Sequence, residues 1–207
     1  MLKNNIFLIL FLMVFSSIIA QQKQDTIGKK SNPIIFGDFN IGYGNGSLRG
    51  LMASVSINYQ SKKNLFSFRH LEIFRYDNID LFFVIPINVE SRSIREYSLL
   101  YGKKYIEKGT SYHFSGGFSY NIYQQIKNNN IIARESFIGF PLEAGISWFK
   151  NKKRRFRLFY GLIPVGKPTS FGRSFGFKLQ ANIARRTYVG IGLTFGLGLH
   201  KVYADEK

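Results

Sequence analysis

The sequence predicts an all-β protein: a closed antiparallel transmembrane β-barrel of eight to ten strands, connected as an up-and-down meander. Apolar residues alternate with small or polar ones over long segments, most regularly in "TYVGIGLTFGLGLH" (187–200). Most of these segments have ten or more residues, whereas soluble strands average about five or six and membrane-spanning strands need about nine to eleven. The chain is also rich in Phe (21), Tyr (12) and Gly (20), which favours strands in close backbone contact.

The N-terminal 20 residues have the pattern of a secretory signal peptide. Lys3 precedes an apolar run, and the small residue Ala20 ends it. An uncleaved membrane anchor is the alternative, because Ile18 is bulkier than the residue usual before a cleavage site, but the run is short for a spanning helix. We expect a signal peptide (1–20), a polar leader (21–33), an outer-membrane barrel (34–203) and a C-terminal tail (204–207).

Period-two alternation begins directly after the leader. In the first segment Ile35, Phe39 and Ile41 face one way, while Asp38 and Asn40 face the other. The expected strands are 34–43, 51–60, 64–75, 94–104, 111–123, 136–149, 155–163, 174–184 and 187–201. An odd number conflicts with the even numbers of bacterial barrels. Either one segment does not span, which leaves eight strands, or 80–89 is a tenth.

Two irregularities predict β-bulges. The alternation in 64–75 slips between Phe68 and Leu71, and Pro141 lies inside an otherwise regular strand, although a closed barrel has no edge strand to hold a proline. The predicted connections also differ in length. Those at 61–64, 106–109, 150–155 and 184–186 are short, while those at 76–93 and 124–135 are long. Alternating short turns and long loops are typical of outer-membrane barrels, which have the short turns in the periplasm.

The alternation also predicts which face meets lipid. A transmembrane barrel is apolar outside and polar or small inside, and its inward glycines leave room for side chains from opposite strands. The alternative is an exported soluble sandwich with the two faces exchanged. Bare glycine would make a poor solvent face, because it weakens strands and supplies no charge.

Charge and cysteine content limit the partners and the chemistry. Without residues 1–20 the chain has 28 Lys and Arg against 12 Asp and Glu, a net charge of +16. In an exported protein this favours anionic headgroups of outer-membrane lipids, phospholipid or lipopolysaccharide, over nucleic acid. Basic residues cluster at 62–63, 103–104, 152–155 and 185–186. No cysteine is present, and the histidines lack metal-ligand spacing, so we expect neither a cofactor nor a metal.

Four stretches carry a resemblance to a known group of proteins: "SSIIAQQ", "SINYQSKKNLFSFRHLE", "YSLLYGKKY" and "IGFPLEAGISWFKNKKRRFRLFYGL". Together they resemble the small outer-membrane β-barrel proteins of Bacteroidota. The similarity covers most of the mature chain and consists of pattern and spacing. It implies the barrel fold and an outer-membrane location, and it implies little about activity, since many such proteins have none known.

Inward charged residues form a predicted polar network in the lumen: Asp38, Glu96, Glu143, Arg157 and Lys178. Opposite charges in a narrow barrel are expected to pair, because an unpaired buried charge is heavily penalised. The result would be a polar plug that fixes the shape of the barrel. A narrow channel is the alternative, although eight strands leave little room for a pore.

The pair His113 and Ser115 is a candidate catalytic element. The two residues share a strand face, and a histidine that activates a serine is the minimum of a hydrolase. The pair resembles the His-x-Ser element of outer-membrane lipid A deacylases. In that family the residues face lipid near a later glutamate, whereas here the face points inward, Gly116 follows, and the next acid is Glu135. We expect a structural or envelope-interaction role without catalysis; a lipid A-modifying hydrolase is the alternative.

The long connection 76–93 contains the apolar stretch "LFFVIP". It is expected to fold into the barrel mouth, form another strand, or contact a protein partner.

Overall fold

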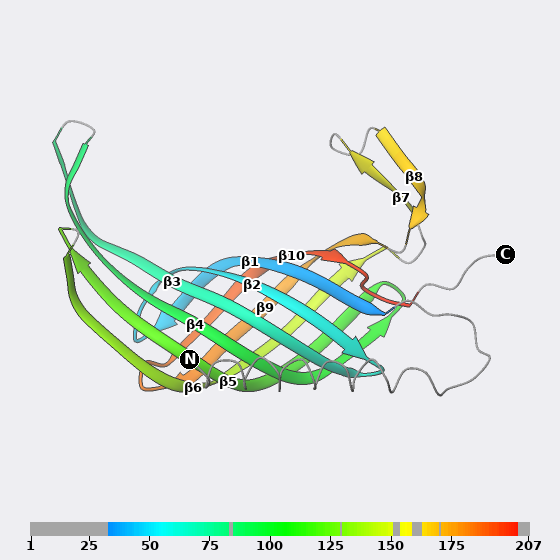
Figure 1. The fold of residues 1–207 in the computed structure, drawn as a ribbon, viewed down its shortest axis with the longest axis horizontal. Coiled ribbons are helices and arrows are strands. Elements are labelled where there is room, and N and C mark those ends of the chain that lie inside the picture. Colours follow the sequence, from blue (N-terminus) through cyan, green and yellow to red (C-terminus); the bar gives the residue numbers. More distant parts are fainter. Residues whose placement is uncertain are drawn as a thin grey trace, which may run out of the picture. The chain divides into compact units, whose positions relative to one another are not determined.

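The computed structural model describes residues 33–82, 85–128, 130–150, 154–158, 163–169 and 171–202, without the side chains of 78–89, 154–158 and 163–169. Eight strands form a closed antiparallel barrel (Figure 1): β1 (Ile34–Gly46), β2 (Gly50–Ser61), β3 (Asn64–Phe82), β4 (Ile85–Glu107), β5 (Thr110–Lys127), β6 (Asn130–Phe149), β9 (Gly172–Ala184) and β10 (Tyr188–Gly198). Each barrel strand pairs with the next along the chain, and β1 pairs with β10. The predicted antiparallel meander is therefore confirmed. No helix in the described residues is long and apolar enough to cross a membrane.

The two ends of the barrel differ in their connections. At one end, here called the terminal end, β1 begins and β10 ends, with Phe36 opposite Gly198. The β2–β3 and β4–β5 turns also lie there and have two residues each, with positive φ at Lys62 (55°), Lys108 (41°) and Gly109 (90°). Left-handed conformations are what two-residue hairpin turns require. The predicted short connections 61–64 and 106–109 are confirmed. The opposite end is called the arm end.

Of the nine expected segments, 155–163 is the one that is not a barrel strand. Strand β7 (Arg154–Leu158) pairs with β8 (Ile163–Thr169) in a separate two-stranded sheet. Strand β6 pairs directly with β9, with Phe149 opposite Ser174. The five residues of β7 are too few to cross a bilayer. The barrel thus has the even number of eight strands, and the connection expected at 150–155 extends from 150 to 171.

The long loops expected at 76–93 and 124–135 are also wrong, because the strands continue through them. Strand β2 pairs with β3 only as far as Phe74, and beyond that point β3 pairs with β4 alone. Residues 76–82 and 85–93 pair as a β-hairpin, here called the β3–β4 arm (Figure 1). Its sequence is rich in apolar β-formers, which explains the strand. The stretch considered as a tenth strand, 80–89, belongs to this hairpin.

The two predicted β-bulges do not occur. Leu65, Ser67, Arg69 and Leu71 are all buried, so the alternation in β3 does not slip. The register between β5 and β6 is the same on both sides of Pro141. Register shifts between the barrel strands lie between Tyr76 and Asn78, Asp80 and Leu81, and Gln125 and Ile126, all toward the arm end.

The outer face of the barrel is apolar and the inner face is polar or small. Along β10, Val189, Ile191, Leu193 and Phe195 are 49%, 60%, 38% and 50% exposed, while the residues that alternate with them are buried. The inward glycines leave room for neighbouring side chains: a Cβ at Gly190 would lie 2.6 Å from the Met52 sulfur. That side chain comes from β2, two strands away around the barrel, rather than from an opposite strand. The predicted apolar-out pattern is confirmed.

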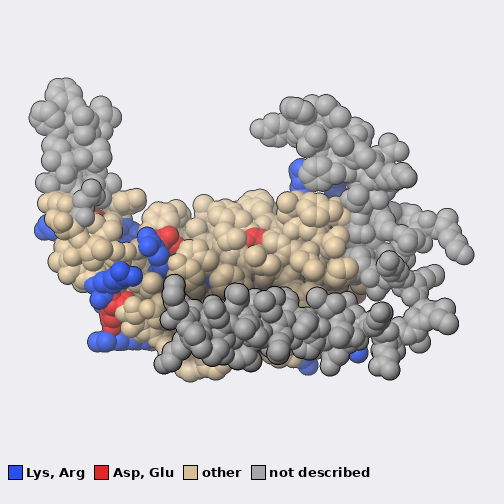
Figure 2. All heavy atoms as spheres, viewed as in Figure 1, with Lys and Arg blue, Asp and Glu red and all other residues tan. Residues whose placement is uncertain are grey.

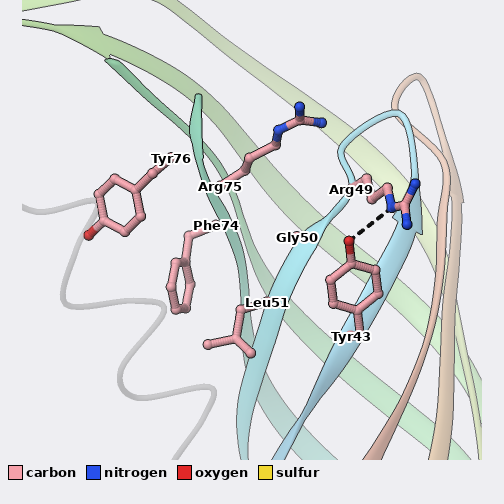
Figure 3. A pocket seen from close by; sticks show the side chains of 7 residues that line it. All are labelled: Tyr43, Arg49, Gly50, Leu51, Phe74, Arg75 and Tyr76. Carbon is pink, nitrogen blue, oxygen red and sulfur yellow. Dashed lines mark hydrogen bonds between the residues drawn. The ribbon is translucent and has the colours of Figure 1, made fainter. Parts of the chain in front are cut away.

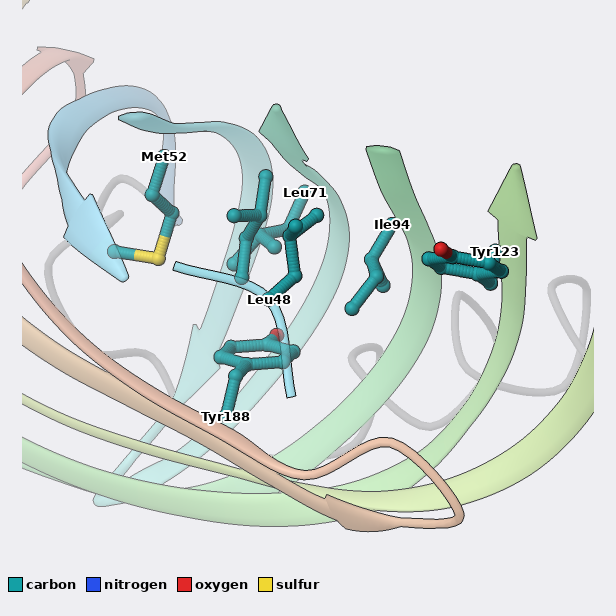
Figure 4. Close-up of a cluster of buried hydrophobic side chains, with 7 residues drawn as sticks. Leu48, Met52, Leu71, Ile94, Tyr123 and Tyr188 are labelled. Carbon is teal, nitrogen blue, oxygen red and sulfur yellow. The ribbon is translucent and has the colours of Figure 1, made fainter. Parts of the chain in front are cut away.

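Apolar side chains occupy the interior at the two ends. At the arm end they form a buried cluster of Leu48, Met52, Leu71, Ile73, Ile94, Tyr123 and Tyr188 (Figure 4). At the terminal end His200 lies between Phe36 and Phe149, with ring centroids 5.1 and 5.5 Å away. The buried charged residues other than Lys104 lie between these layers.

Candidate functional site

The barrel interior contains four of the five residues predicted for the lumen. Asp38, Glu96, Glu143 and Lys178 are each at most 6% exposed and come from β1, β4, β6 and β9. The assignment of Arg157 to the lumen is wrong, because this residue lies in β7, which pairs with β8 outside the barrel sheet. The arginine inside the barrel is Arg69 on β3, which is fully buried.

Arg69 bridges two acidic residues across the interior. Its guanidinium donates from Nη2 to Glu96 Oε1 at 2.6 Å and from Nη1 to Glu143 Oε2 at 2.9 Å. All three side chains are at most 1% exposed. Because buried charges are costly unless paired and hydrogen-bonded, each member of this triad depends on the others. The contacts tie β3 to β4 and, through the lumen, to β6.

Lys178 extends the network to the first strand. Its Nζ donates to Asp38 Oδ1 at 2.7 Å and lies 3.1 Å from Glu143 Oε1. Asn58 Nδ2 donates to the other Asp38 oxygen at 2.6 Å. Glu143 thus contacts both Arg69 and Lys178, which makes it the centre of the network.

Glu96 receives two further hydrogen bonds at its second oxygen. The Tyr188 hydroxyl donates to Glu96 Oε2 at 2.5 Å, and Asn182 Nδ2 donates to the same atom at 2.6 Å. Asn182 also donates to Asn121 Oδ1 at 2.9 Å. The carboxylate therefore has protein donors in place of water, which is what a buried ion requires.

The remaining strands join through Glu143. Gln180 Nε2 donates to Glu143 Oε2 and to Ser54 Oγ, both at 3.1 Å. His113 Nε2 lies 3.1 Å from Glu143 Oε1. With these contacts all eight barrel strands contribute a side chain to one network, which braces the barrel from within.

The interior is balanced in charge and filled. Its buried charged residues in the described chain are three acids and three bases: Asp38, Glu96 and Glu143 with Arg69, Lys104 and Lys178. Paired side chains cross the middle of the lumen, and apolar side chains fill the arm end. An eight-stranded barrel has an interior just wide enough for its side chains. The arrangement is that of a plug.

Lys104 occupies the terminal end of the interior. It is 2% exposed, and its Nζ lies 3.8 Å from the centroid of the Phe36 ring, a cation–π contact. Within the described chain no hydrogen-bond acceptor reaches this ammonium. A cavity of about 10 Å³, lined also by Lys178 and His113, adjoins it and matches a single water molecule. The basic cluster expected at 103–104 is therefore divided, because Lys104 lies inside the barrel while Lys103 is exposed.

His113 and Ser115 face the interior on β5, as their spacing predicts. The register places Glu143 opposite Ser115, so the acid beside His113 is Glu143 and not Glu135. Among the described residues the Ser115 hydroxyl has no hydrogen-bond partner, so His113 does not contact it. Activation of a serine requires that hydrogen bond and space for a substrate. This geometry favours a buried, structural histidine.

A groove of about 470 Å³ lies at the rim of the barrel at the arm end, lined by Tyr43, Arg49, Gly50, Leu51, Phe74, Arg75 and Tyr76 (Figure 3). Tyr43, Leu51 and Phe74 are register partners on β1, β2 and β3, so their side chains form one row. A Cβ at Gly50 would lie 2.3 Å from the Phe74 carbonyl oxygen, so only glycine allows this close approach of β2 to β3. The row gives the groove an aromatic and aliphatic floor.

The same groove carries excess positive charge. Arg49 Nε donates to the Tyr43 hydroxyl at 2.9 Å, and no carboxylate in the described chain pairs with this arginine. Arg75 Nε lies 2.9 Å from Asp77 Oδ1, but Asp77 also accepts two hydrogen bonds of 2.6 Å from Arg92. These bonds from Arg92 lower the pKa of Asp77, so the carboxylate is ionised at neutral pH. Arg75 and Arg92 thus share one carboxylate, and Arg49 has none.

Exposed basic side chains occur at both ends of the barrel. Lys62, Lys63, Lys103 and Lys108 lie at the terminal end, and Arg49, Arg75, Arg95 and Arg185 at the arm end. On the face that Figure 2 shows, blue side chains gather near the arm end and the middle is mostly tan. The pair 185–186 was expected with the other short turns but lies at the opposite end, because β9 and β10 join at the arm end. No group of His, Asp or Glu in the described residues could hold a metal ion.

These features define a class: small, closed, eight-stranded barrels with an apolar outer face and a filled polar interior. No protein-family model and no curated protein sequence matches this chain. A solved structure similar in fold is Ail, the attachment invasion locus protein of Yersinia pestis, in complex with the heparin analogue sucrose octasulfate. The TM-score is 0.50 at 8% identity, covering 82% of this chain and 98% of that chain. This likeness supports the barrel fold alone.

Two further solved structures match at lower scores. They are the N-terminal β-barrel domain of Pseudomonas aeruginosa OprF (TM-score 0.47, 11% identity, 80% of this chain and 98% of that chain) and Neisserial surface protein A (TM-score 0.48, 11% identity, 83% and 99%).

Proposed function

We propose that this chain is an outer-membrane protein whose sealed barrel serves a structural or interaction role at the cell envelope, without transport or catalysis through its lumen. The observation that carries the proposal is the contrast between the two faces: a continuous apolar outer surface and an interior bridged by buried ion pairs. A surface of this kind is unfavourable in water and favourable in hydrocarbon.

The proposed location also rests on the first 20 residues, which have the pattern of an export signal and lie outside the described residues. Barrels that span a membrane occur in outer membranes, and their termini lie on the periplasmic side with the short turns. In this orientation the terminal end faces the periplasm and the β3–β4 arm faces outward. The Bacteroidota origin stays a prediction.

We further propose that the β3–β4 arm is the part of the chain that contacts a protein partner. It is a hairpin paired to the barrel only at its base, which suits presentation of a surface beyond the membrane. The side chains of its apolar stretch, within 78–89, lie outside the described residues.

Conductance separates this proposal from the channel alternative. Purified protein reconstituted into planar bilayers should show no stable single-channel current, because the triad of Arg69, Glu96 and Glu143 crosses the lumen. Arg69→Ala removes the bridging side chain and should also give no stable current, because the apolar cluster still fills the arm end of the lumen. Stable currents from the unmodified protein, altered in ion selectivity by Glu143→Gln, would instead support a channel.

A further inference from the structure

The rim groove at the arm end combines an apolar floor with basic side chains. Its floor is apolar, from Leu51 and Phe74, and its edge toward the arm carries Arg49 and Arg75 on either side of Gly50 (Figure 3). In this view the arginines lie nearer the ends of the strands, while Leu51 and Phe74 point along the outer wall. A ligand for such a groove needs an anionic part and an apolar part.

We propose that this groove binds the phosphorylated headgroup of one membrane lipid, with Arg49 and Arg75 contacting the phosphate and Leu51 and Phe74 contacting the first part of an acyl chain. The inference rests on the proposed membrane location. A phosphate is favoured over a neutral group because guanidinium groups form strong, geometrically specific hydrogen bonds with phosphate oxygens.

Charge complementarity supports this occupant. Asp77 is bound through both oxygens by Arg92, so it only partly offsets the charge of Arg75. Among the described residues, the polar contact of Arg49 is the neutral Tyr43 hydroxyl. Together Arg49, Arg75 and Arg92 with Asp77 have a net charge of three minus one, or +2. A phosphate between the first two arginines would neutralise that excess.

The depth of the groove also fits a headgroup. One outward position nearer the middle of the barrel, Glu72 on β3 forms a salt bridge with Arg95 on β4 at 3.0 Å, and these side chains are 33% and 46% exposed. Beyond them toward the terminal end the outward residues of these strands are mainly aromatic and aliphatic, such as Phe68 and Leu99. Exposed charges of this kind belong at the headgroup level and not in hydrocarbon. The groove therefore lies where lipid phosphates are expected.

The test uses the full-length mature protein, folded in detergent, and native mass spectrometry to count bound lipids during titration. The probes are a diphosphorylated lipid A, the same lipid after removal of its phosphates, and inorganic phosphate as a competitor. The unmodified protein should bind one phosphorylated lipid tightly and the dephosphorylated lipid at least roughly tenfold more weakly. Millimolar inorganic phosphate should not displace the lipid, because it lacks the acyl contacts.

Two variants and a matched control locate the site. Arg49→Gln alone and Arg49→Gln with Arg75→Gln should weaken binding of the phosphorylated lipid by roughly tenfold or more. The control is Arg95→Gln, which removes one positive charge from a side chain as exposed as Arg75, 46%, but outside the groove. It should change the affinity less than twofold. Leu51→Asn should weaken lipid binding while leaving the barrel folded.

Equal lipid binding by the unmodified protein and the double variant would overturn the proposal, because the two arginines would then not bind the lipid. An equal loss of affinity in Arg95→Gln would also overturn it, because diffuse surface charge would then explain the binding. Displacement by inorganic phosphate would show that the site takes free phosphate and would also overturn it. All variants are checked for the gel shift of a closed barrel on heating. A folded barrel without lipid selectivity contradicts only the proposed lipid site in the groove. Absence of the gel shift in the unmodified protein contradicts the proposed membrane location.

Discussion

Glu143 contacts more ionisable side chains than any other buried charged residue in the described chain. It contacts Arg69, Lys178 and His113 while 1% exposed. We therefore expect Glu143→Gln to leave two basic groups underpaired and to lower the free energy of unfolding by about 3–5 kcal/mol, the usual cost of breaking a buried ion pair. The measurement is urea unfolding of the barrel in lipid vesicles, followed by tryptophan fluorescence.

The matched control at this scale is Glu107→Gln, which makes the same change at an exposed position on β4. Exposed substitutions usually change stability by less than about 0.5 kcal/mol. If both variants lose the same small amount, the interior network does not stabilise the barrel.

At the residue scale, sequence pattern identified Asp38, Glu96, Glu143 and Lys178 because each has the inward parity of its strand. Arg69 has that parity too, but the apolar Leu65, Leu71 and Ile73 share its face, and this mixture made β3 look out of phase. These apolar residues belong to the inner layers at the two ends of the barrel. Alternation alone cannot show such layers, because they arise from contacts between distant strands. The pairing of His113 with Glu143 was missed for the same reason.

The elements were easier to predict than their ends. Eight of the nine predicted strands occur in the barrel, and the ninth is the separate β7–β8 hairpin. A short amphipathic segment has the same period whether it crosses a membrane or pairs locally. The period of 155–163 therefore could not show whether this segment belongs to the barrel. The extensions of β3–β6 were missed because their polar and apolar residues do not alternate with period two. That alternation is expected only where one face of a strand meets lipid and the other meets the interior.

The β3–β4 arm gives the prediction at the scale of elements. Deleting residues 79–89 should leave the barrel intact, because β2 pairs with β3 only through Phe74 and β5 pairs with β4 only from Glu90 onward. Assembly is measured by the heat-dependent gel shift. The same deletion should abolish recovery of a partner that crosslinks to the unmodified arm in intact cells. Loss of assembly would mean that the arm is needed for folding and would contradict its assignment as a binding element.

At the scale of the molecule, the charged interior follows from the apolar outer wall. A wall exposed to lipid has no water to satisfy polar groups, so polar side chains are confined to the interior, where they must pair with one another. The network of eight strands does this, and it fills the lumen. A barrel built in this way is suited to holding surface elements in place rather than to passing solutes.

The most direct test of this account is the mobility of the protein from isolated outer membranes on a detergent gel, with and without boiling. We expect the protein in the outer-membrane fraction, with a folded band that migrates differently from the boiled, unfolded form, because a closed barrel resists detergent until heated. Recovery in the soluble fraction with a single mobility would mean that the apolar face does not meet lipid, and would contradict the central claim.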